Sequence, residues 1–214
     1  DFVIAVQESA QYCIELTATP IHDDRGDVAG MVLVFRDVTE IRALARELTY
    51  HASHDPLTGL YNRREFERHL QAALLDARAS GVEYALCYLD LDMFKVVNDT
   101  CGHVAGDELL KQISLMFRQR LRKEDILARV GGDEYAILLR GCTLERAEEI
   151  SEQISGVMKD FRFVWEDKTV DVGVSIGVMR GAADSGDLKD VFRIADVACR
   201  VAKEAGRNRI HLFR

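Results

Sequence analysis

Two adjacent carboxylates follow two glycines in the segment Gly131-Gly132-Asp133-Glu134-Tyr135, and this segment offers the clearest chemistry in the chain. Short β-favouring runs flank it, residues 126–130 and 135–139, and a glycine pair between two such runs predicts a β-hairpin. Side chains alternate in direction along extended chain, so Asp133 and Glu134 are expected to point different ways. An acidic turn in solvent would have the same local sequence, so other motifs must decide between these interpretations.

Two further carboxylates, Asp90 and Asp92, follow the apolar run at residues 84–89, which reads as a buried strand. Carboxylates at the end of a strand are typical of active sites in α/β sheets. Oxygen ligands with no His or Cys beside them suit Mg²⁺ or Mn²⁺. For Asp92, interaction with the dipole at the N-terminus of a following helix is an alternative interpretation.

Basic residues gather near the C-terminus, where Lys203 lies four residues before Arg207. That spacing is about one helical turn, which would let both side chains reach one phosphate tail. The alternative is an ordinary helix end with basic residues and Gly206 as its cap.

The composition limits the function classes. The chain has 214 residues, 48% of them apolar, and a net charge of −8, which argues against a nucleic-acid-binding protein but suits divalent metal. Five scattered cysteines without a CxxC pair make a disulfide framework or zinc site improbable. No apolar run approaches the ~20 residues that span a bilayer. We therefore expect a cytoplasmic protein with no membrane segment in this part, which other regions of a longer protein could attach to a membrane.

The first segment reads as strands at residues 12–19 and 30–36 with a turn at residues 23–27. Two strands do not make an independent domain. Residues 19–21 and 34–40 resemble the end of a PAS sensor domain, so residues 1–37 are expected to be the C-terminal remnant of such a domain.

One helix is predicted over residues 38–54, because Ile41, Leu44 and Leu48 recur at helical spacing after an N-cap signal at Asp37. A helix between a sensor and an output domain commonly pairs with its twin as a short coiled coil. So few heptads do not distinguish this signalling helix from a rigid spacer.

From residue 55 onwards the chain alternates helices and strands, which predicts an α/β domain over residues 55–214. Apolar stripes predict helices over residues 109–117, 144–157 and 188–202, with strands at residues 170–178 and 210–213. These stripes are read as core.

Five segments resemble, in order, the motifs of GGDEF-domain diguanylate cyclases, and together they are specific. They are Asp55-Pro56-Leu57-Thr58-Gly59-Leu60-Tyr61-Asn62-Arg63, Asp90-Leu91-Asp92-x-Phe94-Lys95-x-x-Asn98-Asp99, Gly102-His103-x-x-Gly106-Asp107, Gly131-Gly132-Asp133-Glu134-Tyr135 and Lys203-x-x-Gly206-Arg207-Asn208. Tyr135 departs from the usual Phe but keeps an aromatic ring on the strand.

The resemblance implies a fold class and a reaction. The fold would be α/β (α+β), similar to nucleotidyl cyclases and the polymerase palm, with a central, mostly antiparallel sheet surrounded by helices and an N-terminal signalling helix. The family condenses two GTP molecules into cyclic di-GMP and releases pyrophosphate. Because one half-site holds one GTP, a homodimer would be required for catalysis.

The resemblance also implies roles for the acidic residues. Asp90 and Asp133 would ligate Mg²⁺ or Mn²⁺, with the backbone carbonyl of Leu91 completing the shell. Asp133 is also the family's proposed proton acceptor, although a metal-bound carboxylate is a poor base. Glu134 is the next candidate for contact with metal or hydroxyl.

The remaining motif positions imply nucleotide contacts. Asn98 and Asp107 align with residues that bind the guanine edge, which favours GTP over ATP. Lys203 and Arg207 would hold the terminal phosphates, and Lys95 would neutralise charge that develops during transfer.

A short RxxD pattern, Arg122 to Asp125, precedes the hairpin and resembles the family's product-inhibition site for cyclic di-GMP. The alternative is a charged helix end on the surface.

Two other functions share parts of this sequence pattern. One is a catalytically silent GTP-binding GGDEF domain that regulates a fused EAL phosphodiesterase, because residues 199–212 resemble sequences that continue into such a domain. The other, a nucleic-acid polymerase palm, would need a basic template groove that an acidic chain lacks.

Overall fold

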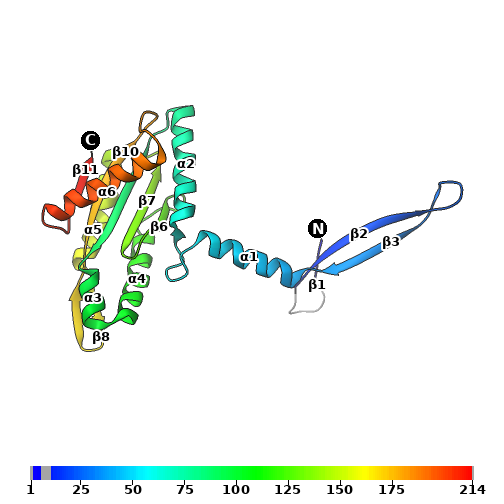
Figure 1. Ribbon diagram of the computed structural model, residues 1–214, viewed down its shortest axis with the longest axis horizontal. Helices are drawn as coiled ribbons and strands as arrows, with labels where there is room; N and C mark the ends of the chain where they lie inside the picture. The colour runs from blue at the N-terminus through cyan, green and yellow to red at the C-terminus, as the bar shows by residue number, and fades with distance from the viewer. Residues whose placement is uncertain (1, 6–10, 214) are drawn as a thin grey trace. The chain divides into compact units, whose positions relative to one another are not determined.

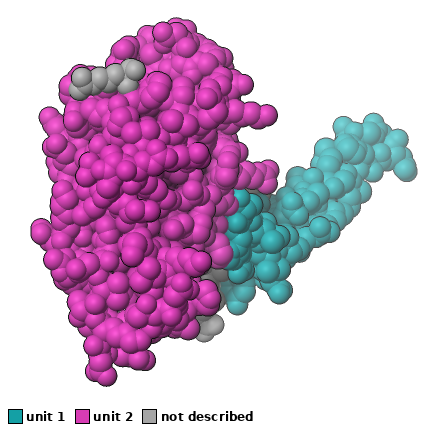
Figure 2. Space-filling view, turned by 60° about the vertical axis from the view of Figure 1, so that its left-hand side comes forward, with its two compact units in different colours: residues 1–52 teal, residues 53–214 magenta. Residues whose placement is uncertain are grey.

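The computed structural model describes residues 2–5 and 11–213. These residues divide into two compact units, with the boundary between Ala52 and Ser53 (Figure 2). In the described part of the chain, no helix is both long enough and apolar enough to cross a membrane.

The first unit contains an antiparallel sheet with the order β1-β2-β3 (Figure 1). Its strands are β1 (Phe2–Ala5), β2 (Gln11–His22) and β3 (Val28–Asp37). The two predicted strands are thus present with wider bounds, and the turn between them is closed by the Asp23 carboxylate, which accepts hydrogen bonds from the N–H groups of Arg25 and Asp27. The apolar side chains of β3 are exposed, including Leu33 at 49% and Phe35 at 59%.

Helix α1 (Thr39–Ser53) is one residue shorter at each end than predicted. The Asp37 carboxylate accepts a hydrogen bond from the N–H of Thr39 at 2.9 Å, which confirms the predicted start signal. The Thr39 hydroxyl in turn accepts from the N–H of Cys13 at 2.8 Å and ties the start of the helix to β2. No residue of α1 is buried.

The second unit is built on a six-stranded sheet with the order β11-β10-β5-β7-β6-β4 (Figure 1). The four central strands pair antiparallel, whereas β11 and β4 join the two edges in parallel. The strands are β4 (Tyr61–Asn62), β5 (Tyr84–Asp92), β6 (Ile126–Arg129), β7 (Glu134–Arg140), β10 (Gly173–Gly181) and β11 (Ile210–Phe213). The predicted α/β class with a mostly antiparallel central sheet is confirmed.

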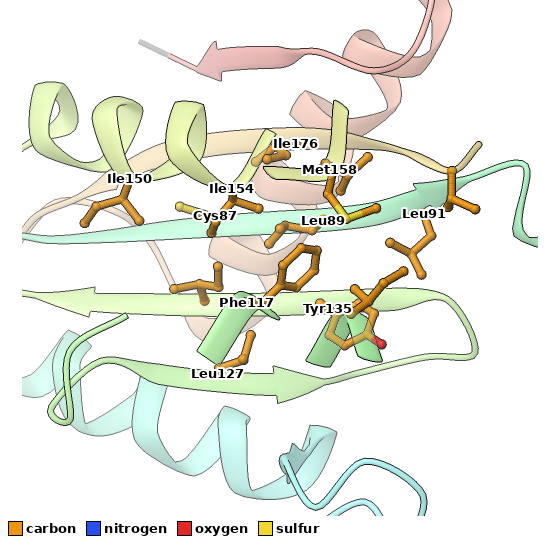
Figure 3. Packing of buried hydrophobic residues seen from close by; sticks show 14 of the residues in the cluster. Cys87, Leu89, Leu91, Phe117, Leu127, Tyr135, Ile150, Ile154, Met158 and Ile176 are labelled. Atoms are coloured by element: carbon orange, nitrogen blue, oxygen red, sulfur yellow. The ribbon is translucent and has the colours of Figure 1, made fainter. Parts of the chain in front are cut away.

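Helices cover both faces of this sheet. They are α2 (Arg63–Ser80), α3 (Phe94–Cys101), α4 (His103–Arg118), α5 (Leu144–Asp160) and α6 (Leu188–Glu204). One core lies between the sheet and α3, α4 and α5, and Figure 3 shows Ile150, Ile154 and Met158 of α5 against Cys87 and Leu89 of β5. The other core lies under α2 and α6 and receives Leu86 and Tyr88 of the same strand. The predicted apolar stripes are therefore core.

The prediction of a single strand over residues 170–178 is wrong, because this segment is divided between two strands. Strand β9 (Lys168–Asp171) pairs with β8 (Arg162–Trp165), which the sequence reading missed, and β10 begins after Val172. Val172 is buried where the chain passes from one sheet to the other. The apolar alternation of Val170, Val172 and Val174 continues through this change and gives no local signal of it.

Candidate active site

Strand β5 carries Asp90 and Asp92 to the end of the sheet. The strand extends three residues beyond the predicted run, so both carboxylates lie on the face that Leu86 and Tyr88 share, toward α6. Helix α6 approaches closely because β10 has Gly177 beneath it, where an added Cβ would lie 2.2 Å from the main-chain nitrogen of Cys199. This packing brings the last turn of α6 over the end of β5.

The predicted hairpin is confirmed as β6 and β7, and it places its carboxylates beside Asp90. Glu134 is the register partner of Asp90 across β5 and β7. The carbonyl of Asp133 accepts a hydrogen bond from the N–H of Leu91 at 3.1 Å. The Leu91 side chain is buried, so only its main chain faces the site.

The two glycines of the hairpin have different surroundings. A Cβ at Gly131 would lie 2.1 Å from Oε2 of Glu134, so the Glu134 side chain folds back over this residue. A Cβ at Gly132 would meet nothing within 4 Å. Gly131 therefore makes room for Glu134, and Gly132 is the glycine that borders open space.

Arg129, which the sequence reading did not single out, holds the hairpin turn. Its guanidinium donates to the carbonyl of Gly132 at 2.8 Å and to the carboxylate of Asp55 at 3.1 Å. Asp55 also accepts from the N–H and hydroxyl of Thr58 at 2.9 and 2.7 Å. Burial alone would raise the pKa of Asp55, but the hydrogen bonds from Thr58 and the charge of Arg129 outweigh it and lower that pKa.

Lys203, in the last turn of α6, forms an ion pair with Asp90, its Nζ 2.5 Å from Oδ2. The Asp90 side chain is 12% exposed. Burial, and then the negative charges of Asp133 and Glu134, raise the pKa of Asp90 to about 6, although Lys203 opposes that shift. Lys203 loses hydration on burial, but the hydrogen bond and charge of Asp90 raise its pKa.

Asp92 has a structural task that neither expectation included. Its carboxylate accepts from the hydroxyl of Ser175 at 2.8 Å and from the N–H of Asn208 at 2.8 Å. The residue before α3 is Met93, and no side chain caps that helix. Asp92 therefore makes no cap hydrogen bond to α3, and two other donors hold its carboxylate.

Lys203 and Arg207 are not one helical turn apart, so that expectation is wrong. Helix α6 ends at Glu204, and the N–H groups of Gly206 and Arg207 return to the carbonyls of Lys203 and Ala202. This is a Schellman arrangement, as the glycine-cap alternative anticipated. Arg207 follows in a left-handed conformation with φ 60° and is exposed.

Asn98 and Asp107 come from α3 and α4, which pack side by side. A Cβ at Gly106 would lie 2.0 Å from Oδ1 of Asn98, so the glycine allows the Asn98 side chain to lie against α4. Gly106 is the residue directly before Asp107. Asp107 and Lys95 are exposed. The two residues expected at the guanine edge are thus brought together.

The RxxD residues lie in the loop between α4 and β6. The buried carboxylate of Asp125 accepts a hydrogen bond from the N–H of Arg122 at 2.9 Å. Arg118, also missed from sequence, donates to the carbonyls of Asp125 at 2.9 Å and Arg122 at 3.0 Å. Asp125 therefore shapes the loop, and the exposed side chain of Arg122 is left facing solvent.

The donor set fits a divalent cation. The charges of Asp133 and Glu134 raise the pKa of Asp90, so these carboxylates are near enough to repel one another and a cation would relieve that repulsion. All are hard oxygen donors, which suit Mg²⁺. No group of three or more His, Cys, Asp and Glu side chains forms a metal site within residues 2–5 and 11–213, so main-chain or non-protein oxygens would have to complete a shell.

The comparisons with known proteins agree with this geometry. A family model described as "Diguanylate cyclase, GGDEF domain" matches residues 52–209. "Probable diguanylate cyclase DgcE" of Escherichia coli is 38% identical over 213 residues, which cover 100% of this chain and 19% of that protein. "Cyclic di-GMP phosphodiesterase PdeB" of Shewanella oneidensis is 35% identical over 202 residues, 94% of this chain and 23% of that protein. The chain thus spans less than a quarter of the length of these two relatives.

A solved structure of the coiled coil and GGDEF domain of DgcB from Caulobacter crescentus, in complex with c-di-GMP, superposes with a TM-score of 0.77 at 26% identity. The match covers 82% of this chain and 93% of that one. The family model spans most of the chain. The hairpin, its neighbouring carboxylates and the sheet agree with this match. The chain therefore belongs to the GGDEF domain family of diguanylate cyclases.

Proposed function

We propose that this chain is an active diguanylate cyclase, which condenses two GTP molecules into cyclic di-GMP and two pyrophosphates. The observation that carries the proposal is the meeting of Asp90, Asp133, Glu134 and Lys203 at one end of the sheet. Four charged groups from three elements converge there, which packing alone does not require.

The reaction joins each 3′-oxygen to the α-phosphorus of the other nucleotide. A new P–O bond forms, the bond between the α-phosphorus and its bridging oxygen breaks, and pyrophosphate leaves; the hydroxyl proton passes to a base. Repeating this step closes the ring. Such transfer depends mainly on positioning and on neutralising negative charge.

We assign the metal site to Asp90 and Asp133 with the main-chain carbonyl of Leu91, and the metal to Mg²⁺ or Mn²⁺. When bound, such an ion polarises the phosphate and lowers the pKa of the attacking hydroxyl. Asp90 would then exchange its bond to Lys203 for the metal, which frees the ammonium group to meet phosphate oxygens. Glu134 would contact the metal or the hydroxyl.

The other residues hold the nucleotide. Asn98 and Asp107 bind the guanine edge, where a carboxylate accepts hydrogens from N1 and N2 that adenine does not offer as a pair. Lys203 and Arg207 hold the terminal phosphates, and Lys95 neutralises charge that develops during transfer. Arg122 and Asp125 form a site at which cyclic di-GMP inhibits the enzyme.

The catalytic form is a homodimer, because each domain holds one GTP and the two must face each other. The exposed apolar stripe of α1 supports a pairing role: Ile41, Leu44 and Leu48 are 65%, 53% and 70% exposed. We assign residues 1–37 to the end of a PAS-like sensor domain, residues 38–54 to the signalling helix and residues 55–214 to the cyclase.

The direct test is to incubate the chain with GTP and Mg²⁺, at a concentration where light scattering shows a dimer, and to separate the nucleotides by chromatography. Cyclic di-GMP should form, and Asp90→Ala and Asp133→Ala should abolish it while GTP binding persists. A wild-type dimer that binds GTP without forming product would contradict the proposal.

One comparison favours a second candidate, a silent GTP-binding domain that regulates an attached EAL phosphodiesterase. The relative named cyclic di-GMP phosphodiesterase is 35% identical across 94% of this chain. The presence of every expected metal, guanine and phosphate residue favours the active enzyme. GTP binding without turnover in the test above would select the regulatory domain instead.

A further inference from the structure

A hollow of about 570 Å³ lies between α2 and α6 and has Glu134 in its wall. Arg63, Tyr88, Phe192 and Asp196 also line it. None of these four has a role in the mechanism above. Arg63 belongs to the first of the five motifs, whereas Tyr88 lies outside all of them.

Tyr88 is placed to reach Glu134. It lies two residues before Asp90 on β5 and therefore on the same face of the sheet. Tyr88 is opposite Ala136 on β7, and Asp90 is opposite Glu134, so Tyr88 and Glu134 are diagonal neighbours within reach of an aromatic side chain. Both residues line the hollow, and Tyr88 is only 7% exposed, so the two side chains border the same space.

The ring of Tyr88 is held by its neighbours. It meets Phe192 edge to face at 6.5 Å between centroids, and Phe192 meets Phe66 in the same manner at 5.7 Å. The Arg63 guanidinium lies 5.9 Å from the Phe192 ring centre and also donates to Glu67 at 3.0 Å. These ring contacts restrict the orientation of Tyr88 and therefore the position of its hydroxyl.

Glu134 is confined from the other side by the hairpin, since its carboxylate lies over Gly131. Between Gly131 and Tyr88 it remains beside Asp90. Without the Tyr88 hydroxyl, the Glu134 carboxylate would be free to rotate into the hollow.

We propose that Tyr88 is a positioning residue for Glu134, whose hydroxyl donates a hydrogen bond that holds the Glu134 carboxylate beside Asp90. This inference rests on the proposed cyclase function for its effect on catalysis. The contact itself does not depend on that function, so the two can be tested separately.

The contact is tested by ¹³C NMR of the whole chain with labelled glutamate. Tyr88→Phe removes the hydroxyl and keeps the ring, and Tyr84→Phe is the matched control, because Tyr84 is buried on the same strand and face at its other end. The carboxyl resonance of Glu134, identified by its loss in Glu134→Gln, should move in Tyr88→Phe and stay in place in Tyr84→Phe. An unchanged resonance in Tyr88→Phe overturns the contact.

The positioning role is tested by kinetics. Loss of a hydrogen bond to a carboxylate should lower kcat on the order of tenfold in Tyr88→Phe. The KM for GTP should be unchanged, because Tyr88 is not among the nucleotide-binding residues, and Tyr84→Phe should retain wild-type kcat. Adding Tyr88→Phe to Glu134→Gln should cost nothing further. An unchanged kcat, or a rise in KM without a fall in kcat, overturns the role.

The two hypotheses fail in different ways. If the wild-type dimer binds GTP but forms no product, the proposed function and the kinetic role of Tyr88 are both overturned. The NMR result then still decides whether Tyr88 holds Glu134.

Discussion

Arg129 forms an ion pair with Asp55, a residue 74 positions earlier in the chain, with Nη1 3.1 Å from Oδ1. The same guanidinium donates to the carbonyl of Gly132 in the hairpin of β6 and β7. The first family motif and the GGDE motif are therefore held together by one side chain. Because both partners are less than 20% exposed, solvent screens this ion pair less than a surface pair.

Arg129→Ala should destabilise the domain. The substitution leaves the Asp55 carboxylate and the Gly132 carbonyl without their donor, which should lower the free energy of unfolding by about 1–3 kcal/mol. Thermal unfolding followed by circular dichroism should show a Tm several degrees lower. Arg140→Ala is the control, since its ion pair with Asp76 is 43% and 61% exposed and should contribute little. Equal Tm values for the two variants would refute the structural importance of Arg129.

The lowered pKa of Asp55 predicts a pH dependence of stability. The folded-state pKa lies below the ordinary value of 3.8, so the stabilising contribution is present above that value and is lost as pH falls through the folded pKa. Asp55→Asn removes this contribution. In urea unfolding, the difference between wild type and variant should be constant from pH 7 to about pH 5 and narrow below pH 4. If the difference in unfolding free energy grew on acidification, the predicted direction of the Asp55 pKa shift would be wrong.

The local patterns predicted several elements well for identifiable reasons. Strand β11 was predicted at its observed bounds, and the apolar stripes of α4, α5 and α6 matched cores on the two faces of the sheet. The GGDE hairpin followed from glycines between two β-favouring runs. In each case the signal lies within one element, where periodicity and turn chemistry act.

The rest depended on tertiary contacts that no local pattern contains. Asp90 and Asp92 have the same chemistry and share a face, and only their partners distinguish them. Asp92 accepts hydrogen bonds from Ser175 and Asn208, whereas Asp90 pairs with Lys203. The pairing of Arg129 with Asp55 joins distant positions in the same way. Tyr88 lies within a run that local sequence identifies only as a buried strand.

The two hairpin glycines should respond differently to alanine. In Gly131→Ala the new Cβ occupies the space of the Glu134 carboxylate, which is the end of a flexible side chain and can move. The fold should therefore survive, with a Tm close to wild type, while the rate of cyclic di-GMP formation falls at least about tenfold because Glu134 is displaced. Gly132→Ala meets nothing within 4 Å and does not require a left-handed φ, so it should retain stability. Equal turnover by wild type and Gly131→Ala would show that the position of Glu134 is unimportant.

The RxxD residues should separate into a ligand contact and a structural residue. Arg122→Ala removes an exposed guanidinium and should raise the concentration of cyclic di-GMP needed for half-inhibition about tenfold or more, with the Tm unchanged. Asp125→Ala removes a buried acceptor of the Arg122 N–H and should lower the Tm as well. Inhibition curves and thermal unfolding on the same preparations test both statements. Unaltered inhibition in Arg122→Ala would assign this arginine to the surface alone.

Helix α1 should set the strength of the dimer. Leu44 and Leu48 are 53% and 70% exposed, and a double substitution to Glu would place charge in the apolar stripe that we propose to pair. Burial of each leucine contributes about 1.5–3 kcal/mol, so the dimer dissociation constant should rise by at least about tenfold. Sedimentation velocity measures this rise, and turnover per chain should become strongly dependent on protein concentration. Arg46→Glu is the control, because Arg46 lies on the opposite face of the helix and adds similar charge without entering the stripe. If the double variant dimerises like wild type, α1 is a rigid spacer and another surface must bring the two half-sites together.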